Sequence, residues 1–130
     1  MANYIPWART NYFKVKDEQK FREDIIDKFG LDYRVDQDGR YGLFPDEDFP
    51  SYYEDEDGEW KDIIFEDAIQ PHLADGEVAI LIHVGYEKMR YGHGYSIAVK
   101  NEGDPMCISL NEIYKKVEDE WGIRPSIAEY

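Results

Sequence analysis

Carboxylates interleaved with aromatic rings are the main candidate chemical groups in this 130-residue sequence. They gather between Phe44 and Asp62, in the runs FPDEDFP and YYEDEDGEWKD. Converging carboxylates can bind divalent cations for hydrolysis, or they can present negative charge to a basic partner. The spacing of the residues distinguishes these two kinds of chemistry.

Neither D-x-D-G run has the spacing of a calcium-binding loop. With Gly58 at position 6 of an EF-hand, positions 1 and 12 fall on Tyr53 and Ile64, which have no carboxylate. The run ending at Gly39 places Arg34 at position 1 and fails as well. A two-metal nuclease site needs carboxylates that converge from rigid elements, whereas these are consecutive in one loop. The spacing therefore favours a surface over a catalytic site.

The histidines and the cysteine do not form a recognisable site either. His72, His83 and His93 lack the ligand spacing of a zinc site. The glycines at 92 and 94 lie inside an expected strand, which predicts close backbone packing or a bulge rather than a phosphate loop. Cys107 lies in the apolar run MCISL and is expected to be a buried structural thiol. We expect no enzyme activity, no cofactor and no bound metal.

Negative charge is concentrated in the middle of the chain. Residues 44–77 carry 13 acidic and one basic side chain, which is a net charge of −12. The net charge of the whole chain is −14. Like charges within a Debye length of about 8 Å repel each other, and a basic partner would relieve this repulsion. A run of solvated charge on an ordinary surface is the alternative interpretation.

The aromatic residues of this segment distinguish it from a disordered acidic tail, which has few rings. We expect an ordered acidic surface, pinned to the domain by its rings. The residues predicted to bind a partner are Asp46, Glu47, Asp48, Tyr52, Tyr53, Glu54, Asp55, Glu56, Asp57, Glu59, Trp60 and Asp62. Duplex DNA carries a negative charge about every 1.7 Å, and its binders use basic grooves and aromatic stacking. The surface therefore predicts a basic nucleic-acid-binding protein as partner, with no direct binding of nucleic acid or membrane.

The length and composition predict a single domain over residues 1–130, with an acidic, aromatic-rich loop at about 44–62. A hydrophobic fraction of 42% is too high for a disordered chain. No apolar run approaches the roughly 20 residues that span a bilayer, and no export signal is visible. We expect a cytoplasmic protein.

The first half of the chain predicts a strand over residues 10–15, followed by a helix. Asp17 is the expected N-cap, and Phe21 and Ile25 recur at helical spacing. Alternating residues on either side of Asp38-Gly39 predict a hairpin over 33–43. Residues 63–72 predict a short helix or turn.

The second half predicts a long hairpin of strands 77–86 and 91–100 at the centre of the sheet. Residues 109–112 (SLNE) match a capping box for a last helix that ends at Gly122. Its residues Tyr114, Val117 and Trp121 are expected in the core, with Phe21 and Ile25 of the first helix. The predicted fold class is α+β, an antiparallel sheet of about five strands with two amphipathic helices.

The runs ARTNYFKVKDEQKFRE, HLADGEVAILIHVGYEKMRYGHGYSIAV and ISLNEIY are similar to small proteins encoded on phages and plasmids. These proteins begin with an SARTNYF-like motif and have an LADGEVAV…GAEKLRY…GYAIA centre. The resemblance covers nearly the whole chain and implies a mobile-element origin, but it identifies no functional residue. Small acidic phage proteins include anti-CRISPR proteins, which block guide-bound effectors, and DNA mimics, which block restriction enzymes. This chain is analogous to both kinds in its charge.

The expected function is therefore that of an anti-CRISPR or antirestriction inhibitor. It would occlude the nucleic-acid-binding surface of a CRISPR effector or restriction enzyme in the host cytoplasm. One alternative is a metal-dependent enzyme acting on nucleic acid. Another is an immunity protein that neutralises a basic toxin, which shares the same electrostatics and differs only in its partner.

Overall fold

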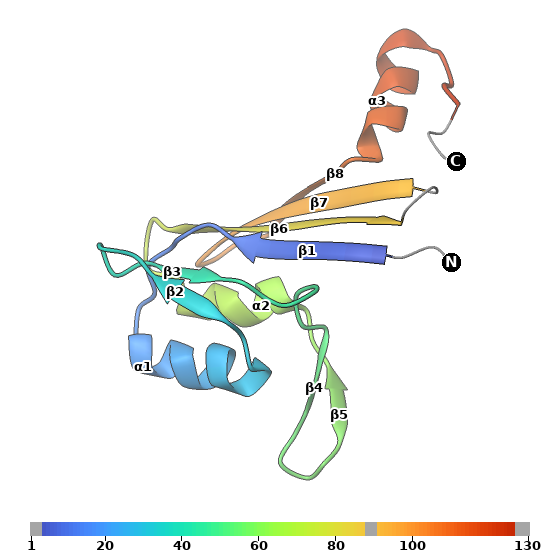
Figure 1. Cartoon of the computed structure of the whole chain (residues 1–130). Helices are drawn as coiled ribbons and strands as arrows, with labels where there is room; N and C mark the ends of the chain where they lie inside the picture. Colours follow the sequence, from blue (N-terminus) through green and yellow to red (C-terminus); the bar gives the residue numbers. More distant parts are fainter. Residues whose placement is uncertain (1–3, 88–90, 127–130) are drawn as a thin grey trace.

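The protein has an α+β fold built from antiparallel sheets, as the sequence predicts. The computed structural model describes residues 4–87 and 91–126, with the backbone alone at 4–6, 86–87 and 91–93. Within these ranges, eight strands form one four-stranded sheet and two two-stranded sheets (Figure 1). The strands outnumber the expected five because both edge strands of the large sheet lack a strong local pattern, and because the acidic segment forms a hairpin where a loop is expected.

The predicted long hairpin lies at the centre of the four-stranded sheet. It consists of β6 (Val78–Glu87) and β7 (Tyr91–Lys100). The edge strand β1 (Tyr4–Thr10) pairs with β6, and the other edge strand, β8 (Met106–Ser109), pairs with β7. The order is therefore β1-β6-β7-β8, and neither edge strand is predicted from the sequence.

Residues 10–15 do not form the predicted strand. The Asn11 N–H still donates to the Ile80 carbonyl at 3.1 Å, after which the chain leaves the sheet and makes isolated bridges from Phe13 to Tyr41 and from Val15 to Leu73. The backbones of Phe13 and Tyr41 exchange hydrogen bonds of 3.0 and 2.8 Å, and both side chains are fully buried. The strand prediction is wrong because the alternating side chains of this segment cross the core without a continuous ladder of hydrogen bonds.

A helical segment follows Asp17, as predicted. Its carboxylate accepts a 3.1 Å hydrogen bond from the backbone N–H three residues later. Helix α1 (Glu18–Phe21) continues directly into η1 (Arg22–Asp27), where the winding widens to the π type. Phe21 and Ile25 are buried, which confirms their place in the core.

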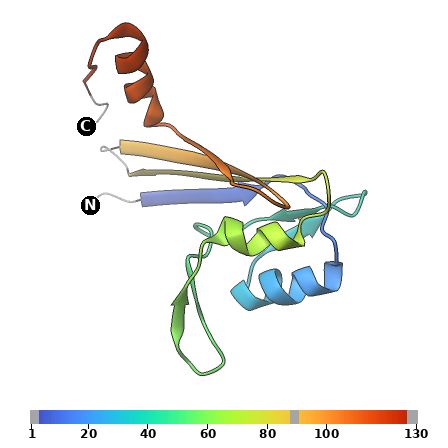
Figure 2. The same cartoon turned by 180° about the vertical axis from the view of Figure 1, so that it is seen from behind.

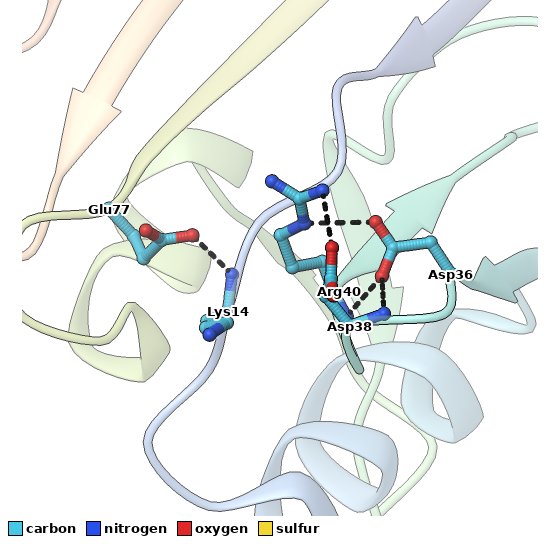
Figure 3. Close-up of polar contacts among 5 residues, drawn as sticks. All are labelled: Lys14, Asp36, Asp38, Arg40 and Glu77. Atoms are coloured by element: carbon cyan, nitrogen blue, oxygen red, sulfur yellow. Dashed lines mark hydrogen bonds and ion pairs between the residues drawn. The ribbon is translucent and has the colours of Figure 1, made fainter.

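The predicted hairpin around Gly39 is also present. Strands β2 (Tyr33–Val35) and β3 (Tyr41–Leu43) pair antiparallel, and Gly39 has a φ of 80°, which favours glycine. The Asp36 carboxylate accepts hydrogen bonds from the backbone N–H groups of Asp38 and Arg40, at 3.0 and 2.9 Å, and pairs with the Arg40 guanidinium (Figure 3). One side chain therefore organises the whole turn.

The core lies between one face of the four-stranded sheet and a layer of shorter elements. This layer contains α1, η1, the β2–β3 hairpin, α2 (Phe65–Ile69) and η2 (Gln70–His72) (Figure 2). The last two elements form the short helix expected over residues 63–72. The buried cluster consists of Phe13, Phe21, Ile25, Ile26, Tyr41, Leu43, Phe65, Ile69, Leu73, Ala79, Leu81 and Val99.

The two faces of the four-stranded sheet differ in their cover. Along β6, Ala79, Leu81 and His83 face the core and are buried. The opposite face of β6 has the larger apolar side chains, Val78, Ile80, Ile82 and Val84, of which the first and last are exposed. The sheet is therefore covered on one face, while a strongly apolar face stays open.

The last helix, α3 (Glu112–Trp121), does not pack on the core. It projects from the sheet on the side away from α1 and α2 (Figure 1). Trp121 is 70% exposed, and none of the helix residues is buried, so the prediction that Tyr114, Val117 and Trp121 lie in the core is wrong. The physical reason is that the helix starts two residues after an edge strand, from which the chain leaves the sheet.

The start of α3 differs from the predicted capping box. Ser109 belongs to β8, the N-cap is Asn111, and no side chain caps the helix. The predicted end at Gly122 is confirmed, because this residue adopts the left-handed conformation with a φ of 67°. Cys107 is exposed on β8, so the prediction of a buried thiol is wrong, since an edge strand outside the helical layer leaves it uncovered.

Candidate protein-binding surface

The acidic segment at 44–62 contains a β-hairpin. Strand β4 (Tyr52–Glu54) pairs with β5 (Trp60–Asp62), and the hairpin projects from the body of the molecule (Figure 1). The sequence predicts an ordered loop here but not these strands. The sequence does contain a signal for this hairpin, because Asp57-Gly58 between aromatic residues has the same pattern as Asp38-Gly39.

The turn of this hairpin is built like the turn between β2 and β3. The Asp55 carboxylate accepts hydrogen bonds from the backbone N–H groups of Asp57 and Glu59, both at 2.9 Å. It also lies 3.6 Å from the Lys61 ammonium, and Gly58 has a φ of 81°. The D-x-D-G run is therefore a hairpin turn in which the first aspartate satisfies backbone donors.

Aromatic contacts attach the acidic segment to the domain, as expected. The ring of Phe49 stacks on Phe65 with centroids 5.5 Å apart. The ring of Tyr53 packs edge-on against Phe29 at 6.0 Å, and the Lys28 ammonium lies 3.9 Å from its centroid. These residues hold the base and the inner side of the hairpin.

The outward side of the hairpin carries both carboxylates and rings. The register pairs Tyr52 with Asp62 and Glu54 with Trp60, so these four side chains share one face. Tyr52 is 59% exposed and Trp60 is 66% exposed, and their rings contact each other at 5.4 Å. This face can therefore offer charge and aromatic surface to the same partner.

The other predicted partner-binding residues have different environments. Asp46, Glu47, Glu56, Asp57 and Glu59 are exposed, whereas Tyr53 and Asp55 are half-buried and maintain the shape of the hairpin. Two of these exposed carboxylates precede β4, and three lie in the turn between β4 and β5.

Asp48 connects the acidic segment to the four-stranded sheet. Its Oδ1 atom lies 3.0 Å from Nδ1 of His83, which is an ion-pair distance when the imidazole is protonated. The same oxygen accepts a 3.2 Å hydrogen bond from the Tyr95 hydroxyl, and the rings of His83 and Tyr95 stack at 5.1 Å. Burial, and then the charge of Asp48, raises the pKa of Tyr95 well above its usual range. The sequence pattern predicts Asp48 only at the partner surface and predicts no role for His83.

A hollow lies beside residues 45–50. It has a volume of about 370 Å³ and is lined by Phe29, Leu31, the prolines at 45 and 50, and carboxylates. The lining carboxylates are Asp32, Asp46, Glu47 and Asp48. Such a hollow suits a long basic side chain, whose aliphatic stem can lie along apolar walls while its charge meets carboxylates.

The candidate metal ligands do not come together in the part of the chain that the structure describes. Within it, no three histidine, cysteine or acidic side chains lie close enough to hold a metal ion. His72 lies 3.8 Å from Asp24, and burial lowers the pKa of this histidine although the nearby carboxylate opposes the effect. The side chain of His93 lies outside the described residues. Among residues 4–87 and 91–126, no helix is long and apolar enough to cross a bilayer.

No protein-family model matches the chain, and no curated protein sequence or solved structure is significantly similar to it.

Proposed function

We propose that the protein is an anti-defence inhibitor of phage or mobile-element origin, of the anti-CRISPR or antirestriction type. It binds the basic nucleic-acid-binding surface of a CRISPR effector or restriction enzyme in the host cytoplasm and keeps nucleic acid out. The observation that carries this proposal is the projecting β4–β5 hairpin. Its outward face combines the carboxylates of Glu54 and Asp62 with the exposed rings of Tyr52 and Trp60.

The electrostatics of the hairpin match a groove that accommodates nucleic acid. Residues 44–62 hold nine carboxylates and one lysine. Proteins that bind single strands combine basic grooves with aromatic side chains on which bases stack. An acidic hairpin with exposed rings can occupy such a groove, with carboxylates in place of phosphates and rings in place of bases.

The hairpin is also shaped before it meets a partner. Asp55 fixes the turn, and Tyr53 fixes the inner face against Phe29 and Lys28. Ordering a loop on binding costs conformational entropy, and a preformed hairpin lowers this cost. In this arrangement the exposed carboxylates steer the encounter, and Trp60 and Tyr52 anchor the complex.

The test is affinity capture from a lysate of the host, with the bound proteins identified by mass spectrometry. The wild-type protein should capture a basic nucleic-acid-binding protein and displace nucleic acid from it. A variant with Glu54→Lys, Glu56→Lys and Glu59→Lys should lose this partner, because the new lysines have the same positive charge as the groove and repel it. The matched control carries Glu102→Lys and Asp104→Lys, which reverse two exposed charges between β7 and β8.

Kinetics with the captured partner separate charge from anchoring. Neutral replacements such as Glu56→Gln and Glu59→Gln should slow association and flatten its dependence on salt. Trp60→Ala should instead speed dissociation. The proposal fails if the triple variant still binds, or if metal-dependent cleavage of nucleic acid appears and is lost with Asp55→Ala and Asp57→Ala.

A further inference from the structure

The open face of the four-stranded sheet is a second surface that is distinct from the acidic hairpin. We use "open face" for the residues that share this side of the sheet by register: Trp7, Arg9, Val78, Ile80, Ile82, Val84, Gly94, Ser96, Ala98, Lys100, Met106 and Ile108. Ile108 is 65% exposed and Met106 is 73% exposed. Soluble monomers rarely expose contiguous apolar patches larger than a few hundred Å². This face is therefore a candidate contact surface.

Helix α3 has an apolar stripe that is also left without cover. Ile113, Val117 and Trp121 recur every four residues and lie on one side of the helix. Ile113 and Trp121 are exposed, and none of the helix residues is buried. The chain thus has two complementary apolar surfaces, one flat and one helical.

The connection between β8 and α3 directs the helix away from its own sheet. The Leu110 N–H donates a 2.9 Å hydrogen bond to the Gly94 carbonyl. A Cβ atom on Gly94 would lie 3.3 Å from a methyl group of Leu110, so the glycine lets this leucine sit close to the sheet. This confirms the close packing expected at Gly94. It also fixes the start of α3 and leaves only Asn111 for a reversal of direction.

We propose that the open face and the apolar stripe of α3 form a homodimer interface, in which α3 of each copy lies across the open face of the other. A two-fold axis satisfies both surfaces at once, because each copy supplies one helix and one sheet face. The dimensions agree, since ten helical residues span about 15 Å and four strands about 14 Å.

The charge of the chain permits this contact despite the net value of −14. The positions of the open face carry Arg9 and Lys100 and no carboxylate. Helix α3 has four acidic and two basic residues, a net charge of −2. The helix therefore meets a face of opposite sign, while the acidic segment lies on the other side of the molecule (Figure 1). Because of this separation, the inference does not depend on the proposed function.

A hollow in the open face offers a place for a side chain of the second copy. It has a volume of about 220 Å³, and its lining includes Ile82, Val84, Gly94, Ser96, Ile108 and Leu110. Trp121 is the largest side chain on the apolar stripe of α3 and lies at the end of the helix distant from its own sheet. We assign the indole of Trp121 to this hollow of the other copy.

The test is the mass of the purified full chain in solution, measured by sedimentation at about 100 μM. The expected mass is twice the 15.4 kDa of one chain. Trp121→Lys and Ile108→Lys should each give a monomer, because each places a charge in the apolar contact. The matched control is Trp60→Lys, which changes an equally exposed tryptophan on the acidic hairpin and should stay dimeric. Circular dichroism and melting curves show that each variant is folded.

Mixing the two monomeric variants tests the reciprocal arrangement. The Trp121→Lys chain keeps an intact sheet face, and the Ile108→Lys chain keeps an intact helix, so their mixture restores one of the two contacts. A mixed dimer should appear at concentrations where neither variant self-associates. A monomeric wild type, as expected if α3 folds back or another protein covers the face, overturns the proposal. So does a dimer that survives both variants or a mixture that stays monomeric.

Discussion

At the scale of single residues, Thr10 joins the four-stranded sheet to the β2–β3 hairpin. Its side chain is fully buried, although it is polar. Its hydroxyl accepts a 2.9 Å hydrogen bond from the Leu43 N–H and donates to the Asn11 carbonyl at 2.8 Å. A buried backbone N–H needs a partner, and this threonine supplies it across two sheets.

We predict that Thr10→Val lowers the free energy of unfolding by about 1–3 kcal/mol, because the buried Leu43 N–H loses its acceptor. Valine keeps the shape of threonine, so the effect reports the hydrogen bond rather than a cavity. Chemical denaturation measures it. Thr10→Ser is the control, since it keeps the hydroxyl and loses one methyl group, worth about 0.8 kcal/mol. A valine variant as stable as the wild type would show that Leu43 finds another acceptor.

The residue scale also shows what a sequence pattern leaves open. The carboxylates of the acidic segment look equivalent in sequence, yet Asp48 contacts His83 and Tyr95, and Asp55 organises a turn. His83 lies 35 positions from Asp48, and no local pattern predicts that they meet. The sequence therefore identifies the charged region, while the division of its residues between structure and surface depends on long-range contacts.

At the scale of elements, the β2–β3 and β4–β5 hairpins use the same turn for different purposes. Asp36 and Asp55 accept equivalent backbone hydrogen bonds, each followed by a glycine with a φ near 80°. Strand β3 is entirely buried, whereas β5 is entirely exposed. The first turn therefore supports the core, and the second supports only the projecting hairpin.

This difference predicts opposite outcomes for a matched pair of substitutions. Asp36→Ala should lower the global free energy of unfolding by about 1–3 kcal/mol, because the turn next to the buried strand β3 loses three hydrogen bonds to one carboxylate, two of them half-buried. Asp55→Ala should change global stability by under about 0.5 kcal/mol. It should nevertheless accelerate hydrogen exchange at the Asp57 and Glu59 amides. Equal global effects of the two variants would show that the acidic hairpin unfolds together with the core.

The elements that the sequence predicts correctly have local signals. The first helix has a cap and a regular apolar spacing, and the β2–β3 and β6–β7 hairpins have alternating residues around a turn. The edge strands β1 and β8 lack such signals because their partners define them. An amphipathic pattern correctly predicts α3 as a helix with one apolar side. The pattern does not specify whether that side packs against the core of the same domain.

At the scale of the whole molecule, charge and apolar surface lie at opposite sides. The acidic hairpin projects on the side of the sheet that the helical layer covers (Figure 2). Helix α3 projects on the opposite side, which is that of the open face. Repulsion within the acidic segment opposes folding in the absence of a partner, since excess charge of one sign destabilises a compact state.

We predict that the melting temperature rises when salt increases from about 0.01 to 0.15 M, because the Debye length falls from about 30 to 8 Å. Calorimetry at one fixed protein concentration measures the change. Replacing Glu54, Glu56 and Glu59 by glutamine should raise the melting temperature at low salt and flatten its salt dependence. Replacing Glu102 and Asp104 by their amides should have a smaller effect. A melting temperature that falls with salt would contradict this account of the repulsion.

The pairing of β1 with β6 has a consequence for the order of events during synthesis. Thr10 pairs with Leu81 and Tyr4 with Glu87, so β1 leaves the ribosome long before β6, the strand with which it pairs. The β2–β3 and β4–β5 hairpins pair strands that are close in sequence, so they can form before β6 is available to β1. Non-local strand pairing is slow because the chain loses the entropy of closing a long loop before the new contacts stabilise it. The nascent chain therefore carries β1 without its sheet partner until β6 has been synthesised.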